Sequence, residues 1–416
     1  MTRLMTVSIL CLAGAFQPVF GQNFLPPTEL AIDAIAKQAE VLAADERVSA
    51  VDAQARALAI GSYELSATVI PQRRRTNTGQ SLDEFEVELG RSFRLPGKVP
   101  LDREIGERSR NIASLERNEI AHEAAHQLLD RWMQWLRATA AAEESKAQLQ
   151  SLQTERTSLA RRVEIGDAAQ LDLDLITAEL AQARATALHA EALVTAAKHA
   201  LNTDFPQIPL PARAPALPEP HPLAGTSDEW QTRIASEAYE LKSAEHAAAR
   251  QDASAKRATA DRIPDPSLGV RFFNERDGQE RAVGLVFTMP LAGRYRRELA
   301  SAERAQARAL QRDVEVVKRG LAKSAYLKVA FATDALRQWQ AQHEAHVAMR
   351  AAATRTYRAW ELGETGLAER LLAARRAREM TYQELEARAE ALDAQLRVRI
   401  DSHDLWHIGS EEGEKQ

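Results

Sequence analysis

The feature that most constrains this chain is an alternating pattern at residues 262–294, RIPDPSLGVRFFNERDGQERAVGLVFTMPLAGR. Two prolines near its start, Pro264 and Pro266, exclude a helix there and favour extended backbone. Residues 267–274 and 281–289 are predicted to be strands, and the Asp-Gly pair between them is typical of a hairpin turn. In the second strand Val283, Leu285, Phe287 and Met289 fall on one face, with Ala282, Gly284, Val286 and Thr288 on the other.

A similar hairpin pattern occurs earlier, with strands predicted at residues 63–72 and 84–94 and a polar turn between them. Here Phe85, Val87 and Leu89 alternate with Glu84, Glu86 and Glu88. One apolar and one polar face suit a wall between lipid and water, so the three glutamates are candidates to line the wet side and tune cation preference. The alternative is that they are solvated residues without a selective role, and this is favoured because wide channels select poorly.

The rest of the chain is predicted to be long helices. It is rich in Ala, Leu, Glu and Arg, whereas aromatic residues make up only 5%, and this composition favours long helices over ordinary globular cores. Helices are expected at residues 26–60, 100–205 with a break at 163–167, 226–260, and 294–400 with a break at 361–364. No stretch after residue 21 is apolar enough for a transmembrane helix, and the net charge of −5 argues against nucleic-acid binding.

An internal repeat organises these elements. The ends of the two hairpins match, because Phe93 and Pro96 correspond to Phe287 and Pro290, and the helix break at 164–167 (EIGD) corresponds to 361–364 (ELGE). The predicted domains are a first repeat at 22–205, a proline-rich connector at 206–225 and a second repeat at 226–400. Four strands cannot close a sheet in lipid, so a ring of several copies is expected.

The two chain ends are predicted to lie outside the repeats. Residues 1–21 have the pattern of a cleaved secretory signal peptide, with Arg3 before a short apolar segment. The only cysteine, Cys11, lies within that segment, so the mature chain would have no thiol chemistry. The polar residues 401–416 are predicted to be a disordered tail.

These motifs resemble those of the TolC-like outer-membrane efflux proteins. The resemblance rests on residues 264–269, 287–293, 164–166 and 361–363 and covers nearly the whole mature chain. It implies a mainly α protein with a small β part: a homotrimer whose strands form one barrel in the outer membrane of a Gram-negative bacterium and whose helical hairpins form a periplasmic tunnel. Its implied partners are a periplasmic adaptor and an inner-membrane pump of the RND type. The modest length and short hairpins are most similar to the heavy-metal branch.

The resemblance also implies that the helix breaks form a closed periplasmic tip narrowed by acidic side chains. Glu369 matches one acidic position by its spacing from Gly363, whereas Leu372 occupies the second. The candidates at the tip are Gly166, Asp172, Asp174, Gly363, Glu364 and Glu369. A ring of carboxylates in a narrow pore would repel anions and attract cations. The alternative is that these are ordinary solvated acids near helix starts, where the helix dipole favours them.

One motif points elsewhere. Residues 122–126 read His-Glu-Ala-Ala-His, the pattern of zinc peptidases, and Glu143 or Glu144 could serve as a third ligand. The motif lies within a long Ala-rich helix with no surrounding domain to form a cleft, so it is interpreted as a chance match. No catalytic residue, metal or other cofactor is therefore predicted. Residues 343–346 (HEAH) are interpreted as a solvated helix face.

The sequence as a whole favours a passive export channel that is not an enzyme. Substrate would enter from a pump and leave through the barrel, and the energy would come from that partner. A periplasmic coiled-coil adaptor and, less favoured, a zinc peptidase are the alternatives. The cargo is not indicated, because no cluster of His or Met marks metal ions and no aromatic pocket marks drugs.

Overall fold

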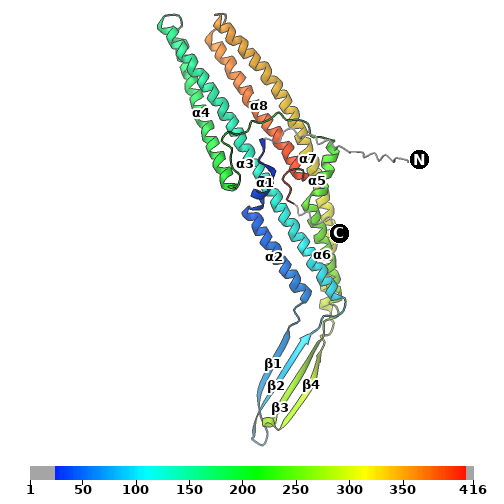
Figure 1. The fold of residues 1–416 in the computed structure, drawn as a ribbon. Coiled ribbons are helices and arrows are strands. Elements are labelled where there is room, and N and C mark those ends of the chain that lie inside the picture. Colours follow the sequence, from blue (N-terminus) through cyan, green and yellow to red (C-terminus); the bar gives the residue numbers. More distant parts are fainter. Residues whose placement is uncertain (1–23, 409–416) are drawn as a thin grey trace, which may run out of the picture.

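The computed structural model describes residues 24–408, which form an elongated molecule with helical hairpins at one end and a sheet at the other (Figure 1). The elements are α1 (Thr28–Ala36), α2 (Ala39–Ile60), β1 (Leu65–Arg75), β2 (Ser81–Ser92), α3 (Lys98–Glu164), α4 (Gln170–Asp204), α5 (Ser227–Glu237), α6 (Tyr239–Ala260), β3 (Ser267–Glu275), β4 (Glu280–Thr288), α7 (Arg294–Glu361) and α8 (Leu367–Asp401). The predicted signal peptide lies outside the described residues.

Two helices set the length of the molecule. Helix α3 has 67 residues and α7 has 68, so each is about 100 Å long at 1.5 Å per residue. Towards the sheet they pack with α2 and α6, and at the other end α3 pairs with α4 and α7 with α8. The two repeats therefore share one architecture, as the sequence predicts. No helix in the described part of the chain is long and apolar enough to cross a membrane.

The predicted single helices at 26–60 and 226–260 are each two helices. The first is interrupted at Gln38 and the second at Ala238, both with extended backbone. No glycine or proline marks either break. At the first break the side-chain amide of Gln38 donates a hydrogen bond to the carbonyl of Asp204 at 2.7 Å. Contact with the end of α4 therefore stabilises the bend at Gln38, which the local sequence does not signal. The break at Ala238 occupies the equivalent place in the second repeat.

The four strands form one antiparallel sheet in the order β1-β2-β3-β4. The register places Val87 opposite both Val69 and Phe272, and Phe272 opposite Val283, so apolar residues of all four strands share one face. That face is uncovered, since Val283 is 72% and Leu285 79% exposed. The predicted alternation is confirmed. Within the described chain β1 and β4 each pair on one side only.

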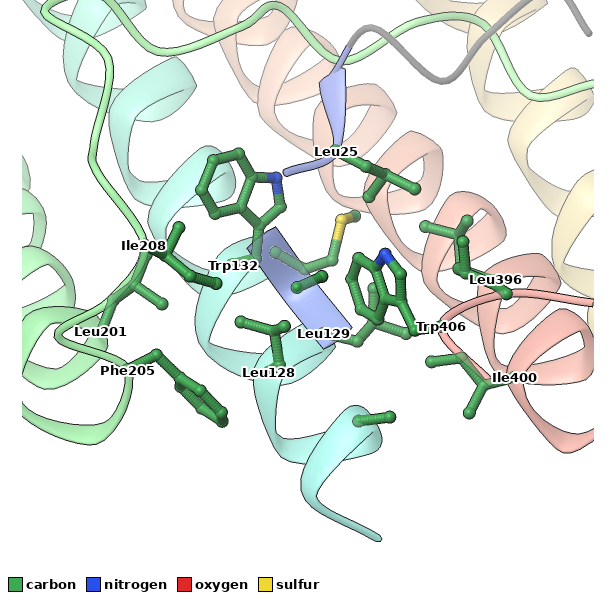
Figure 2. Packing of buried hydrophobic residues seen from close by; sticks show 14 of the residues in the cluster. Leu25, Leu128, Leu129, Trp132, Leu201, Phe205, Ile208, Leu396, Ile400 and Trp406 are labelled. Atoms are coloured by element: carbon green, nitrogen blue, oxygen red, sulfur yellow. The ribbon is translucent and has the colours of Figure 1, made fainter. Parts of the chain in front are cut away.

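The largest apolar core lies midway along the molecule, where α3 meets the ends of α4 and α8 (Figure 2). Trp132, Leu128 and Leu129 of α3 contribute to it, and the indole of Trp132 donates a hydrogen bond to the carbonyl of Phe24 at 2.8 Å. This core fixes the beginning of the described chain against the middle of α3.

The core also corrects the prediction that residues 401–416 form a disordered tail. Asp401 ends α8, and the backbone then turns so that Leu405 and Trp406 pack into the core beside Leu396 and Ile400 (Figure 2). Leu405 and Trp406 are apolar residues in an otherwise polar segment, and they become buried only through tertiary contact. Residues 409–416 lie outside the described residues.

The two helical hairpins turn in the same way. Gly166 and Gly363 both have positive φ, 79° and 76°. The amide of Gly166 bonds to the carbonyl of Val163 and that of Asp167 to Arg162; the amides of Gly363 and Glu364 bond likewise to Trp360 and Ala359. Both are Schellman turns, which require a left-handed residue after the helix end. This requirement explains the repeated glycine, and the predicted breaks are confirmed.

These turns generate a stability prediction with an internal control. Gly166→Ala or Gly363→Ala should each lower the free energy of unfolding by about 1–2 kcal/mol, because a Cβ is strained at this φ although nothing would contact it. Gly320→Ala, in the interior of α7 with equally open surroundings, should raise it by roughly 0.5–1 kcal/mol. Chemical denaturation of the three variants checks the opposite signs. Destabilisation by Gly320→Ala as well would show that strain at the turns is not the cause.

Candidate functional site

We call the two turns at 165–169 and 362–366, with the first helical turns that follow them, the tip. Helix α4 begins at Gln170 and α8 at Leu367, so Asp172 and Glu369 both occupy the third helical position. Exposed N–H groups at a helix start stabilise negative charge, and this alone accounts for an acid at that position. The structure thus gives the predicted pair equivalent places, one in each repeat.

The other predicted tip residues have ordinary surroundings. Asp174 is exposed and accepts a hydrogen bond from Gln170 at 3.0 Å. Glu364 is exposed just after the left-handed Gly363. Within residues 24–408 these acids make no ion pair with the opposite hairpin. Within the described chain, ion pairs of these acids therefore do not join the two hairpins.

The hairpins are joined by a different acid, which the sequence analysis did not single out. Glu179 of α4 accepts hydrogen bonds from Arg375 at 2.7 Å and from Arg378 at 2.5 Å, both on α8. Its residue surface is only 4% exposed. Burial alone would raise the pKa of the Glu179 carboxyl, but the two guanidinium groups outweigh burial and hold the pKa below its usual value. A buried carboxylate thus bridges the two repeats near the tip.

A second bridge lies closer to the turns. Arg370 of α8 pairs with Glu155 of α3, and its guanidinium lies over the rings of Tyr357, at 5.2 Å, and Trp360, at 5.7 Å. Such stacking stabilises a cation at an aromatic face. Burial raises the pKa of Glu155 despite this partner. The arginine is therefore held by groups from both hairpins.

Apolar contacts complete the junction. The buried residues beneath these ion pairs come from α3, α4 and α8: Leu152, Leu159, Ile176, Ala183, Leu367 and Leu371. Glu179 and Arg370 interrupt the buried stripes to which Ile176, Ala183, Leu367 and Leu371 belong. A charged residue at a buried position of a helix is therefore a signal that the sequence contains. The sequence does not reveal which residue is its ion-pair partner.

The surroundings of the β2 glutamates differ from the prediction. Glu84, Glu86 and Glu88 do lie on the polar face of the sheet, opposite the apolar one. Glu84, however, is buried and accepts hydrogen bonds from Gln72 and Arg74 and from the backbone amide of Arg276. Glu86 and Glu88 both lie against Arg271. Neighbouring arginines therefore compensate much of this negative charge.

The junction between sheet and helices is also charged. Lys98 is buried and its ammonium lies 2.8 Å from Asp265 and 2.9 Å from Asp261. Asp265 also accepts from the backbone amide of Leu95 and the hydroxyl of Tyr63. Burial would raise the pKa of Asp265, but these donors, Lys98 foremost, hold it below its usual value. The Pro-Asp-Pro segment at 264–266 thus ties the start of β3 to the first repeat.

The His-Glu-Ala-Ala-His segment does not form a peptidase site. Glu123 is exposed, away from the half-buried His122 and His126, so it is not placed as a general base beside them. Glu143 lies 17 residues beyond His126 on the same helix, about 25 Å away along its axis. The two imidazoles instead face Asp401, at the end of α8.

Comparison with known proteins identifies the fold. No protein-family model matches this chain, and no curated protein matches it in sequence. Among solved structures, CusC matches with a TM-score of 0.72 and 15% identity over 90% of this chain and 91% of CusC. The outer-membrane channel OprN matches at 0.70 and 19%, over 93% and 92%. The Neisseria gonorrhoeae outer-membrane channel MtrE, in its open state, matches at 0.70 and 17%, over 90% and 88%.

The chain therefore has the TolC-like fold found in outer-membrane channels. The predicted fold class is confirmed, including the helical hairpins and the two β-hairpins. The similarities to CusC, OprN and MtrE are of nearly equal strength, so the structure does not assign the chain to a particular branch of these channels.

The bridge at Glu179 gives a prediction with a pH dependence. Glu179→Gln should lower the free energy of unfolding by about 1–3 kcal/mol at pH 7, because it removes charge-assisted hydrogen bonds. A pKa below its ordinary 4.5 means that the wild-type stabilisation is present above about pH 4.5 and is lost as pH falls through the folded pKa. The difference between the two proteins in thermal or chemical unfolding should therefore shrink in acid. Asp174→Asn is the matched exposed control and should change little; an equal loss in both variants would refute the bridge.

Proposed function

We propose that this protein is the outer-membrane channel subunit of a tripartite efflux system and acts as a homotrimer. The observation that carries the proposal is that the sheet has an uncovered apolar face and two edge strands, β1 and β4, that pair on one side only within the described chain. A surface of this kind is stable where hydrocarbon covers the face and further strands complete the edges. Three copies of a four-stranded sheet would supply twelve strands, an even number suited to such a barrel.

In this assembly the helices would form a tunnel beneath the barrel. Three copies of each hairpin pair would bring their tips together around one axis. Glu369 and Asp172 would then be repeated around the opening, and such rings favour cations over anions in a narrow passage. The open, exposed placement of Glu369 supports this use, since its carboxylate makes no ion pair with the opposite hairpin in the described chain.

Opening of the tip would require the hairpins to move apart. The contacts that oppose such a movement are the bridges made by Glu179 and Arg370 and the apolar cluster between them. Ion pairs and small apolar contacts can exchange at modest cost, whereas the long helices remain intact. We therefore infer that these bridges hold one arrangement of the tip and that a partner at this end changes it.

The partners and location extend the proposal. An adaptor and an RND-type pump would dock at the tip and supply the energy, since conduction through the channel itself is passive. The protein would be exported by its signal peptide and reside in the outer membrane with most of its length in the periplasm. Within this proposal we place it in the heavy-metal branch, on its modest length and short hairpins and on the acids at the tip.

The oligomer is tested directly in native membranes. The protein should fractionate with the outer membrane, and after detergent extraction it should have the mass of three chains and a gel mobility that changes on heating. The physical reason is that strand pairing between copies satisfies the backbone at β1 and β4. A soluble periplasmic monomer would exclude the channel and favour the adaptor.

The gate is tested by conductance in a planar bilayer. Glu369→Ala should raise single-channel conductance or weaken block by divalent cations, because it removes three carboxylates from the proposed opening. Asp313→Ala removes an exposed acid from the part of α7 nearer the sheet and should leave the traces unchanged. Unchanged traces for Glu369→Ala would remove Glu369 from the gate while leaving the channel itself intact.

A further inference from the structure

A cluster of metal-binding side chains lies far from the tip, where α3, α7 and α8 meet. His122 and His126 of α3 direct their Nε2 atoms at one oxygen of Asp401, with N–O distances of 3.2 and 3.0 Å. The three potential ligand atoms lie within 4.8 Å of one another. Neighbouring ligands of a tetrahedral zinc ion are separated by about 3.4 Å, given bond lengths near 2.0–2.2 Å. The spacing between the carboxylate and each imidazole is close to this value.

Asp401 lies at a position where a negative charge is locally unfavourable. It is 6% exposed and lies in the last turn of α8, where the helix dipole opposes negative charge. Two residues later His403 adopts a positive φ of 60°, a conformation that favours glycine. A sequence that departs from local rules at a buried site is a sign of function.

The surroundings of Asp401 leave one oxygen for a ligand role. Its second oxygen lies 2.8 Å from the ammonium of Lys328 on α7. Metal-bound carboxylates are commonly oriented by a charged or polar group behind them, and here the ion pair with Lys328 occupies that place. Lys328 would orient the carboxylate, while the oxygen between the two imidazoles faces the ion.

The imidazole of His126 can also present the lone pair of Nε2. The buried Nδ1 of His126 has no hydrogen-bond partner among the residues that the structure describes. Moving the ring proton from Nε2 to Nδ1 therefore breaks no other hydrogen bond of His126, and it frees Nε2 to bind an ion. His122 adjoins a cavity of about 10 Å³, roughly one water molecule in size, whose walls include His403 and His407. A water or a further imidazole is therefore near for a fourth ligand.

We propose that His122, His126 and Asp401 bind a divalent transition-metal ion that joins the middle of α3 to the end of α8. Two imidazoles and one carboxylate suit Zn²⁺, Cu²⁺, Ni²⁺ or Co²⁺ and not Mg²⁺ or Ca²⁺, which prefer oxygen ligands alone. The site is structural: it cross-links the two repeats, and Glu123 is exposed, away from this donor set. It does not depend on the proposed channel function.

The proposal is tested by metal binding to the purified full-length protein in detergent. After treatment with a chelator, Zn²⁺ measured by calorimetry should bind with one site per chain and raise the unfolding temperature, whereas Mg²⁺ at the same concentration should do neither. Co²⁺ should give visible absorption bands of a site with nitrogen ligands, and Zn²⁺ should displace them. Wild-type protein that gives neither a Zn²⁺ isotherm nor a Co²⁺ spectrum would overturn the site.

Variants separate this site from other histidines. His126→Gln retains a polar side chain and should weaken Zn²⁺ binding at least tenfold, with loss of the Co²⁺ spectrum. His199→Gln removes an exposed histidine of α4 and should bind as the wild type does. Equal affinity of His126→Gln and wild type would refute the assignment. If His126→Gln fails to fold, X-ray absorption of the Co²⁺-loaded wild type decides, and a shell of oxygen alone would also overturn it.

Discussion

The organisation of this protein depends on one unsatisfied requirement, the backbone hydrogen bonds at the open edges of β1 and β4. The sheet has a complete internal register but ends on both sides in N–H and C=O groups that the described chain does not pair. Its apolar face is also uncovered, with Leu285 79% exposed. An isolated sheet of this kind in water would aggregate, and in lipid its edges would be too costly. Other copies of the chain and a hydrocarbon environment would resolve both problems together, which is why we propose a trimeric assembly in a membrane.

Buried charges join the two repeats at several places along the molecule, in addition to the apolar cores. Alanine-rich helices bury little apolar area per residue, so large side chains gather in a few places such as the core around Trp132. Between those places buried ions connect the halves: Lys98 with Asp265 near the sheet, Asp401 with the histidines of α3 in the middle, and Glu179 with the arginines of α8 near the tip. Buried pairs of this kind are costly to break on one side but contribute modest net stability. Their placement along the length suggests that they determine how the repeats align.

Features fixed by local chemistry could be predicted from the sequence. The hairpin alternation and the glycine turns depend on residues close in the chain, and the fold class followed from their duplication. Partners distant in sequence could not be predicted: Glu179 reads as one more acid in a helix, and Asp401 was assigned to a polar tail. The histidine pattern at 122–126 is visible in the sequence, but the carboxylate that both imidazoles face lies 275 residues beyond His126, whereas the sequence points to Glu143 or Glu144 on the same helix. The bends at Gln38 and Ala238 are not predicted because neither glycine nor proline marks them, and at Gln38 a tertiary contact with Asp204 stabilises the bend.

The nearly equal lengths of α3 and α7, 67 and 68 residues, have a consequence for how such a chain can change over time. A single residue inserted into either helix would advance everything beyond it by about 1.5 Å and rotate it by about 100°. Every contact above that point, including those of Glu179 and Arg370, would then lose its register. Substitution is tolerated far better than insertion in such an architecture. Solved channels with only 15–19% identity align with 90% or more of this chain, which is consistent with this constraint. In this fold the packing therefore constrains the number of residues along the long helices more strictly than their identity.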